Sequence, residues 1–161
     1  SSNAAATNTV VWSDELPTSD HLTVGEDGSG WGTNENGDNY IGYLFASVKG
    51  YCKVGSFVGN GSTNGIFVYT GFRPRYVMTK KTDGVSHWYQ WDSERSPSNQ
   101  VQKVLWLNYN SEVEGDHTAY AIDFLSNGFK VRNDQTDTNT SGSTQYYVAY
   151  AERPFKYANA R

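Results

Sequence analysis

The chain has 161 residues, a formal net charge of −4 and 15% aromatic residues, and only 19% of its residues are charged. Its aromatic content excludes a disordered chain, and its longest apolar stretch, residues 40–48, is far shorter than the ~20 residues that span a bilayer. The mild acidity and the lack of a long Lys/Arg run exclude nucleic acid and a membrane surface as expected partners. The single cysteine, Cys52, excludes an internal disulfide framework.

Gly, Asn, Ser and Thr make up 60 residues, and they fall between short runs with period-two patterning, which predict strands. In chain order the predicted strands are residues 40–48, 53–59, 66–70, 75–81, 87–92, 103–108, 120–125, 129–133 and 146–152. Asp83-Gly84 predicts a hairpin and Ser126-Asn127-Gly128 a turn, while only residues 98–103 suggest a short helical turn. We expect an all-β antiparallel β-sandwich of the jelly-roll or concanavalin-like kind, because two packed sheets use both apolar-run and alternating strands.

The chain also repeats itself. Residues 34–46 (NENGDNYIGYLFA) match residues 139–151 (NTSGSTQYYVAYA) at an offset of 105, with the Asn, the Gly and the closing Ala retained. Residues 1–47 are therefore predicted to be a half-unit that resembles the C-terminal half of a repeat, and residues 48–161 its full copy. We expect the two to pack as one all-β domain, or the half-unit to pack on a neighbouring chain; chance likeness of two Tyr- and Gly-rich strands is the alternative.

Three segments carry a resemblance to a family: residues 55–74, residues 123–132 (DFLSNGFKVR) and residues 147–161 (YVAYAERPFKYANAR). Together they resemble an uncharacterised repeat domain of bacteriophage tail-fibre and other virion proteins, of the marine and cyanophage type, often found with concanavalin-like modules. Cys52 departs from the small residue, such as serine, expected there. The resemblance implies a component of the virion surface, and it identifies neither a receptor nor a catalytic motif.

Two groups of carboxylates could carry chemistry. Asp92 and Glu94 follow a tryptophan, and residues 112–116 hold an acidic run. Residues two apart on a strand share a face, so such a pair could serve as the acid and base of a glycosidase. The alternative is a solvated loop in which Arg95 pairs with the Asp92 and Glu94 charges.

Metal sites are weakly indicated. Residues 26–30 and 34–39 place oxygen ligands on Gly-rich turns, as Ca²⁺ requires, but neither matches the twelve-residue helix-flanked loop. His21, His87 and His117 are scattered without ligand spacing, so we expect no zinc site. We expect no cofactor, with calcium as the alternative. Cys52 begins a predicted strand and is expected to be a structural, half-buried cysteine.

The aromatic residues suggest a binding surface. Along residues 87–92, Trp88, Gln90 and Asp92 lie on one face of the predicted strand, and His87, Tyr89 and Trp91 lie on the other. One face is expected in the core, and the other could offer a glycan platform, because rings cover the apolar face of a pyranose while polar neighbours bind its hydroxyls. The candidate glycan-binding residues are Trp88, Gln90, Trp91, Asp92, Trp106 and Tyr109. The alternative is that these aromatics pack between sheets or in a subunit interface.

From the resemblance and the repeat layout we expect a non-enzymatic structural protein of a phage virion, a terminal module of a tail fibre or appendage that binds a host-surface glycan. We also expect a homo-oligomer, with the trimeric phage fibre as the analogy, and contacts with other virion subunits. Two alternatives remain. One is a capsid decoration or tail-assembly protein without a receptor, and the other is a glycan depolymerase that uses the carboxylates described above.

Overall fold

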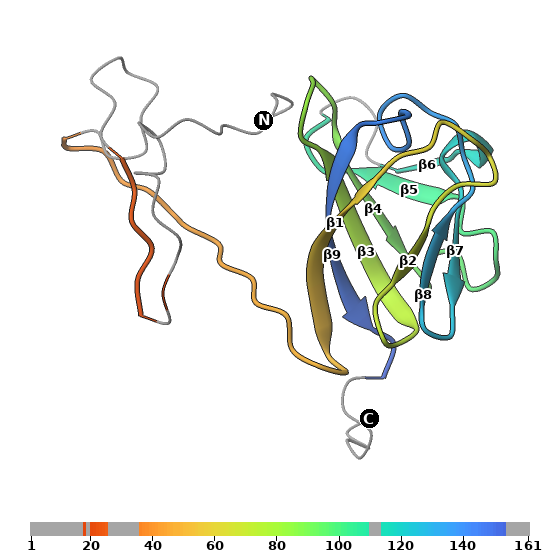
Figure 1. Cartoon of the computed structure of the whole chain (residues 1–161), viewed down its shortest axis with the longest axis horizontal. Helices are drawn as coiled ribbons and strands as arrows, with labels where there is room; N and C mark the ends of the chain where they lie inside the picture. The colour runs from red at the N-terminus through yellow and green to blue at the C-terminus, as the bar shows by residue number, and fades with distance from the viewer. Residues whose placement is uncertain (1–17, 19, 26–35, 110–113, 154–161) are drawn as a thin grey trace. The chain divides into compact units, whose positions relative to one another are not determined.

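The structure is a computed structural model, and it describes residues 18, 20–25, 36–109 and 114–153. The chain divides into two compact units, Ala5–Leu44 and a body that includes Phe45–Arg161. In the first unit the described residues form no helix or strand, so all the described strands belong to the body (Figure 1). No helix in the described part of the chain is long and apolar enough to cross a membrane.

Short strands dominate the body, as predicted. They are β1 (Cys52–Val58), β2 (Phe67–Tyr69), β3 (Pro74–Lys81), β4 (Trp88–Asp92), β5 (Lys103–Trp106), β6 (Glu114–Asp116), β7 (Ile122–Leu125), β8 (Gly128–Val131) and β9 (Thr144–Ala151), with one 3-10 turn, η1 (Thr118–Tyr120). All of them except β6 fall on predicted runs. The sequence of β6 holds no apolar residue, and this strand forms by pairing with β5.

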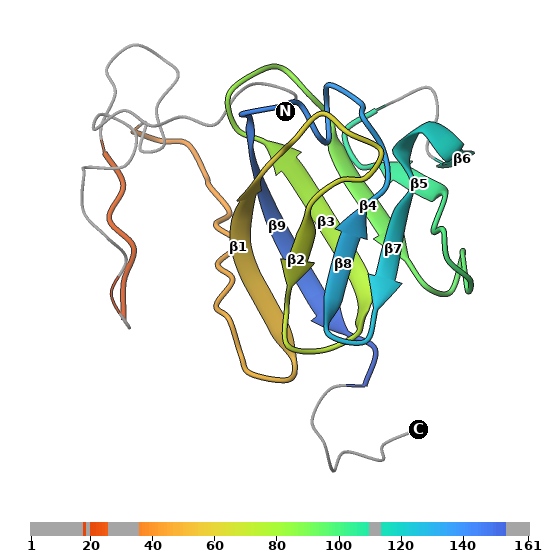
Figure 2. The ribbon, with the colours of Figure 1, turned by 45° about the vertical axis from the view of Figure 1, so that its right-hand side comes forward.

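Two antiparallel sheets make up the body, which confirms the predicted β-sandwich. The larger sheet has the order β1-β9-β3-β4-β5-β6, and the smaller has the order β2-β8-β7. Figures 1 and 2 both show the smaller sheet in front of one face of the larger. The last strand, β9, lies between β1 and β3, so each face of the larger sheet combines residues from both ends of the body.

The core lies between the sheets and is rich in aromatic rings. Alternate residues of each strand point into it, as the period of two requires. Its buried members are Phe57, Val68, Val77, Tyr89, Trp91, Val101, Val104, Ile122, Phe124, Phe129, Val131, Tyr147 and Ala149. On β4 the alternation buries Tyr89 and Trp91 and leaves Trp88, Gln90 and Asp92 on the outer face of the larger sheet.

The predicted turns are found, with differences in detail. Ser126 and Asn127 form the turn between β7 and β8. The hairpin at Asp83 joins β3 to β4, but its connection runs over residues 82–87. The Asp83 carboxylate accepts a hydrogen bond from the Ser143 hydroxyl, which ties this loop to the residue just before β9. The helical turn predicted over residues 98–103 is wrong.

Residues 98–100 form bends and Val101 bridges to β7, so no helical turn forms here. The Asn99 side chain donates to the Phe124 carbonyl and accepts from its amide, both at 2.9 Å. Val101 then forms a β-bridge with Ile122. These bonds to a neighbouring strand take the place of bonds within a helical turn, and no periodicity of the local sequence reports them.

The strand predicted over residues 40–48 is also wrong for the described structure. Residues 36–47 contain no strand, and Val48 makes only an isolated bridge with Cys52. The Ser47 hydroxyl accepts a hydrogen bond from the Val54 amide at 3.0 Å, so a side chain occupies the edge of β1 where a paired backbone would lie. Ile41 and Tyr43 are about four-fifths exposed, at 81% and 80%.

Candidate functional site

The predicted glycan-binding residues do not lie together. They form two groups on opposite sides of the larger sheet, and one further residue, Trp91, lies in the core. Trp88, Gln90 and Asp92 are partly exposed together on the outer face of the larger sheet. Trp91 points the other way and is only 1% exposed, and its indole N–H donates to the Tyr120 carbonyl at 2.9 Å. Its place in the binding set is therefore corrected: Trp91 is a core residue, because it has the opposite strand parity from Trp88.

Trp106 and Tyr109 form the second group, on the inner side of the larger sheet. Trp106 lies opposite the buried Tyr89 in the pairing of β4 with β5. Its ring is 4.7 Å from that of His117 and 5.6 Å from that of Tyr109, measured between centroids. Trp106 packs against the core, while Tyr109 remains 40% exposed. These two residues do not join Trp88 in one surface, and their contacts fit the packing alternative.

The buried Tyr89 also belongs to this inner aromatic cluster. Tyr89 donates from its hydroxyl to Asp137 Oδ2 at 2.9 Å, and its ring stacks on that of Tyr120 at 5.1 Å. Burial, followed by the hydrogen bond to the Asp137 carboxylate, raises the pKa of Tyr89 far above its ordinary value. The phenol therefore stays protonated and acts as a hydrogen-bond donor in the core.

The outer face of the larger sheet forms a row of large side chains across three strands, which we call the Trp88 face. Lys80 on β3 lies directly opposite Trp88 on β4 and opposite Tyr146 on β9. Tyr146 is 56% exposed, whereas Lys80 is buried and donates to the Lys81 carbonyl at 2.8 Å. Burial lowers the pKa of Lys80. Gln90 lies two residues along β4 from Trp88, on the same face, opposite Met78.

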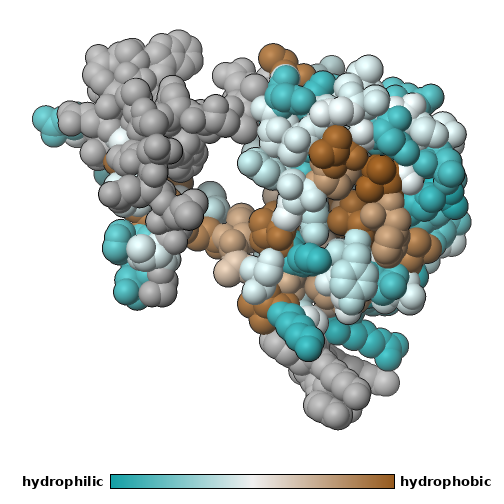
Figure 3. All heavy atoms as spheres, in the orientation of Figure 1, coloured by the Kyte–Doolittle hydropathy of each residue, from teal (hydrophilic) through white to brown (hydrophobic). Residues whose placement is uncertain are grey.

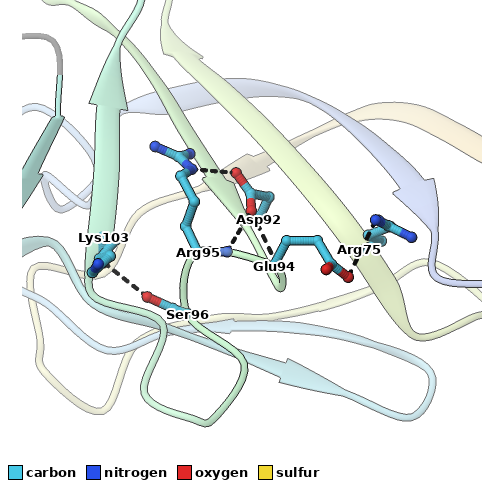
Figure 4. A network of polar contacts seen from close by, with 6 residues as sticks. All are labelled: Arg75, Asp92, Glu94, Arg95, Ser96 and Lys103. Atoms are coloured by element: carbon cyan, nitrogen blue, oxygen red, sulfur yellow. Dashed lines mark hydrogen bonds and ion pairs between the residues drawn. The ribbon is translucent and has the colours of Figure 1, made fainter.

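The carboxylates Asp92 and Glu94 lie at the end of β4 in a network of ion pairs (Figure 4). Asp92 Oδ2 is 2.5 Å from Arg95 Nε, and Asp92 Oδ1 accepts the amides of Glu94 and Arg95 at 3.1 and 2.9 Å. Glu94 pairs with Arg75 at 3.2 Å. This arrangement resembles the alternative in which arginine pairs with both carboxylates, except that Arg75 from β3, and not Arg95, pairs with Glu94.

The electrostatics of Asp92 oppose a role as a catalytic acid. Burial would raise the pKa of Asp92, but the hydrogen bonds and the charge of Arg95, together with the Glu94 amide, outweigh it and hold that pKa below its ordinary value. A glycosidase acid needs a raised pKa so that it carries its proton near neutral pH. Of the acidic run at residues 112–116, Glu112 lies outside the described residues, and only the backbone of Glu114 and Asp116 is described.

Metal ligands do not gather in the described structure. The described residues contain no group of three or more His, Cys, Asp or Glu side chains that could hold a metal ion. The calcium loop predicted at residues 26–30 lies outside the described residues, and of the loop at residues 34–39 only 36–39 are described and exposed. Cys52 is buried, 8% exposed, and its thiol donates to the Ala46 carbonyl at 3.1 Å, as expected of a structural cysteine.

The sequence reasoning missed a second exposed aromatic pair, on the outer face of the smaller sheet. Phe67 and Tyr69 flank the buried Val68 on β2 and are 42% and 58% exposed. Figure 3 shows hydrophobic residues gathered on the face that carries β2 and β8. The alternating pattern of residues 66–70 could have indicated this pair. However, the sheet that packs on β2 decides which set of alternate residues faces the solvent.

Comparison with known proteins identifies a family but no activity. A family model described as a domain of unknown function, DUF7483, matches residues 1–154. No curated protein matches the chain, and no solved structure does.

Proposed function

We propose that this chain, which belongs to the DUF7483 family, is a non-enzymatic structural protein of a phage virion. In this proposal it is a surface module of a tail fibre or appendage that binds a host-surface glycan. The virion setting rests on the resemblance of residues 55–74, 123–132 and 147–161 to phage repeat domains. The binding role rests on the Trp88 face.

One observation carries the binding role: the Trp88 face combines rings with hydrogen-bonding groups. The register sets Trp88 and Tyr146 on either side of Lys80, with Gln90 two residues along β4 from Trp88 on the same face. Neighbouring strands lie about 4.8 Å apart, so the Cα atoms of Trp88 and Tyr146 are roughly 10 Å apart, a spacing that one oligosaccharide can span. Rings of this kind cover the apolar faces of sugars, and the Gln90 amide both donates and accepts hydrogen bonds to hydroxyls.

The carboxylates support binding over hydrolysis. Asp92 and Glu94 are each engaged by an arginine, and the pKa of Asp92 is lowered. A depolymerase would need one of these groups protonated near neutral pH and the other free to act as nucleophile or base. The geometry supports a sandwich that holds a glycan without cleaving it.

A pull-down with a panel of envelope polysaccharides tests the binding role. The panel contains purified O-antigens and capsular polysaccharides from marine bacteria and cyanobacteria, immobilised on beads. We expect the chain to bind at least one of them, Trp88→Ala to weaken that binding by at least tenfold, and Val85→Ala to leave it unchanged. Val85 is the matched control because it is an apolar residue, 74% exposed, in the β3–β4 connection. No binding to any polysaccharide, or equal binding by both variants, would remove the glycan role.

A second candidate, a role in assembly without a receptor, is favoured by residues 40–45. Apolar side chains there are exposed, with Ile41 at 81%, Tyr43 at 80% and Leu44 at 66%. Exposed apolar segments of this kind commonly mark interaction sites. In this proposal residues 1–47 are a half-unit that contacts another copy or another virion subunit, and the chain forms a homo-oligomer.

Sedimentation and labelling of virions test this second candidate. We expect the wild-type chain to sediment as an oligomer and the double variant Ile41→Ser, Tyr43→Ser to sediment as a smaller species. A wild-type chain that stays monomeric at all concentrations would contradict self-association. Immunogold labelling then separates the locations: label on tail appendages supports the fibre module, and label on the capsid supports the decoration protein.

A further inference from the structure

We infer that the outer face of the smaller sheet is a separate binding site for an acidic saccharide, centred on Phe67 and Tyr69. The site lies on the opposite side of the sandwich from the Trp88 face, and the glycan role proposed above does not assign it. The inference rests on that proposed function only for the class of ligand. The geometry and charge of the Phe67 and Tyr69 site do not depend on the proposed function.

Each ring of the pair lies against backbone. A Cβ built on Gly128 would lie 2.9 and 3.0 Å from two ring carbons of Phe67, and one built on Gly71 would lie 3.5–3.8 Å from the phenol oxygen and ring of Tyr69. The ring of Phe67 therefore occupies the space over Gly128, and that of Tyr69 extends over Gly71. Gly128 thus allows the Phe67 ring to lie close to the sheet, and Gly71 allows the Tyr69 ring to lie close to the bend that follows β2.

The spacing of the two rings suits a saccharide. Phe67 and Tyr69 are two positions apart on one strand, so their Cα atoms are separated by about 6.7 Å along β2. They remain 42% and 58% exposed although they lie against the sheet. Exposed rings so arranged offer an apolar surface long enough for a disaccharide, whose apolar ring faces they can cover.

Positive charge adjoins the rings. Lys53 Nζ lies 5.2 Å from the centroid of the Tyr69 ring and donates to the Tyr69 carbonyl at 2.7 Å. Lys130 on β8 lies directly opposite Phe67. Among the described residues neither lysine lies within 4 Å of a carboxylate oxygen.

The nearest carboxylate in the register is already neutralised. Asp123 on β7 lies opposite Lys130, but its Oδ2 atom is 2.5 Å from Arg132 Nε. The aromatic pair therefore lies beside two cations that form no ion pair with the described residues, on a chain whose net charge is −4. Such local charge complements an anion, and the rings complement a sugar, so a uronate-type or otherwise acidic saccharide satisfies both.

Alginate oligosaccharides, which are polyuronates, serve as the probe, with neutral dextran oligosaccharides as the comparison, and titration calorimetry as the assay. We expect alginate to bind and dextran to bind more weakly. Loss of a partly buried ring should weaken alginate binding by at least about tenfold in Tyr69→Ala, while Tyr69→Phe should retain it. Thermal unfolding of each variant confirms that it is folded.

Charge and specificity are tested in the same assay. Lys130→Gln should weaken alginate binding and reduce its dependence on salt between about 0.1 M and 1 M, where the screening length falls from about 10 Å to about 3 Å. Lys49→Gln is the matched control, since Lys49 is an exposed lysine in the turn before β1. Val85→Ala, at an exposed apolar residue of the β3–β4 connection, should leave alginate binding unchanged.

The outcomes separate this inference from the proposed function. If alginate binding is absent, or survives in Tyr69→Ala, the acidic-saccharide site is overturned even where the polysaccharide pull-down succeeds through Trp88. If alginate binding depends on Tyr69 and Lys130 but the pull-down fails, the site stands and the host-glycan role falls. Equal binding of poly-glutamate or of a single-stranded oligonucleotide would also overturn the inference, because either would show that charge, or stacking on bases, accounts for it.

Discussion

The substitution Asn139→Ala tests how the loops that frame the sandwich are held. Asn139 is fully buried, and its side chain links two loops. Its amide nitrogen donates to Asn60 Oδ1 at 3.0 Å, to the Ser62 carbonyl at 2.9 Å and to the Asn133 carbonyl at 2.6 Å, and its Oδ1 accepts the Asn60 amide at 3.0 Å. Alanine removes all of these bonds at once.

The loss of stability in Asn139→Ala can be estimated from the polar groups that the substitution leaves without hydrogen-bond partners. Asn133 is 2% exposed, so its carbonyl would lose a partner where water cannot replace it, at about 1–3 kcal/mol. Asn60 and Ser62 are reached by water and add less. We expect a loss of about 2–4 kcal/mol in the free energy of unfolding, which at about 4 °C per kcal/mol lowers Tm by about 8–16 °C in a domain of this size.

Urea denaturation followed by tryptophan fluorescence measures this loss. Asn64→Ala is the matched control: Asn64 is exposed in the same loop as Asn60, and its substitution should change stability by less than about 0.5 kcal/mol. If Asn139→Ala costs less than about 1 kcal/mol, or no more than the control, then the buried amide does not hold the loops together and the reasoning fails.

Three further predictions concern single residues. A Cβ on Gly128 would lie 2.1 Å from the Val68 carbonyl oxygen, so Gly128→Ala should cost roughly 2–3 kcal/mol in urea denaturation, and a neutral effect would contradict the close approach. Because the pKa of Asp92 is lowered in the fold, its ionised form stabilises the protein above the ordinary carboxyl range, and this stability disappears as pH falls through the lowered pKa. Acid titration of the free energy of unfolding should therefore be less steep in Asp92→Asn than in the wild type, and equal slopes would exclude the pairing with Arg95. Cys52, 8% exposed, should react with a thiol reagent only as fast as the protein unfolds, and rapid labelling of the native protein would show that it is accessible.

Strand positions could be predicted from the sequence because they depend on local patterning. Period-two alternation and turn residues located β1 to β5 and β7 to β9 to within a few residues. Two of the failures, at residues 98–103 and at β6, share one physical cause, since both depend on a partner elsewhere in the chain. The Asn99 side chain ties the segment at residues 98–103 to the backbone of Phe124, and β6 forms by pairing with β5.

The candidate site could be predicted only in part. The alternation of residues 87–92 separates Trp88 from Trp91, but the sequence does not say which parity faces the core. The smaller sheet settles this by covering the face that bears Tyr89 and Trp91. Tyr146 and Lys80 join Trp88 only because β9 inserts next to β3, a long-range pairing that no local pattern reveals. Phe67 and Tyr69 were missed for the same reason.

Heteronuclear NMR on the tryptophan side chains tests the glycan role most directly. The indole N–H signals of an isotope-labelled chain are followed while each polysaccharide of the panel is added, and Trp88→Phe and Trp91→Phe variants assign the two signals. If the Trp88 face binds a glycan, the Trp88 signal should shift with added polysaccharide while the Trp91 signal, whose indole donates to the Tyr120 carbonyl in the core, stays in place. A Trp88 signal that does not move with any polysaccharide would contradict the proposed function.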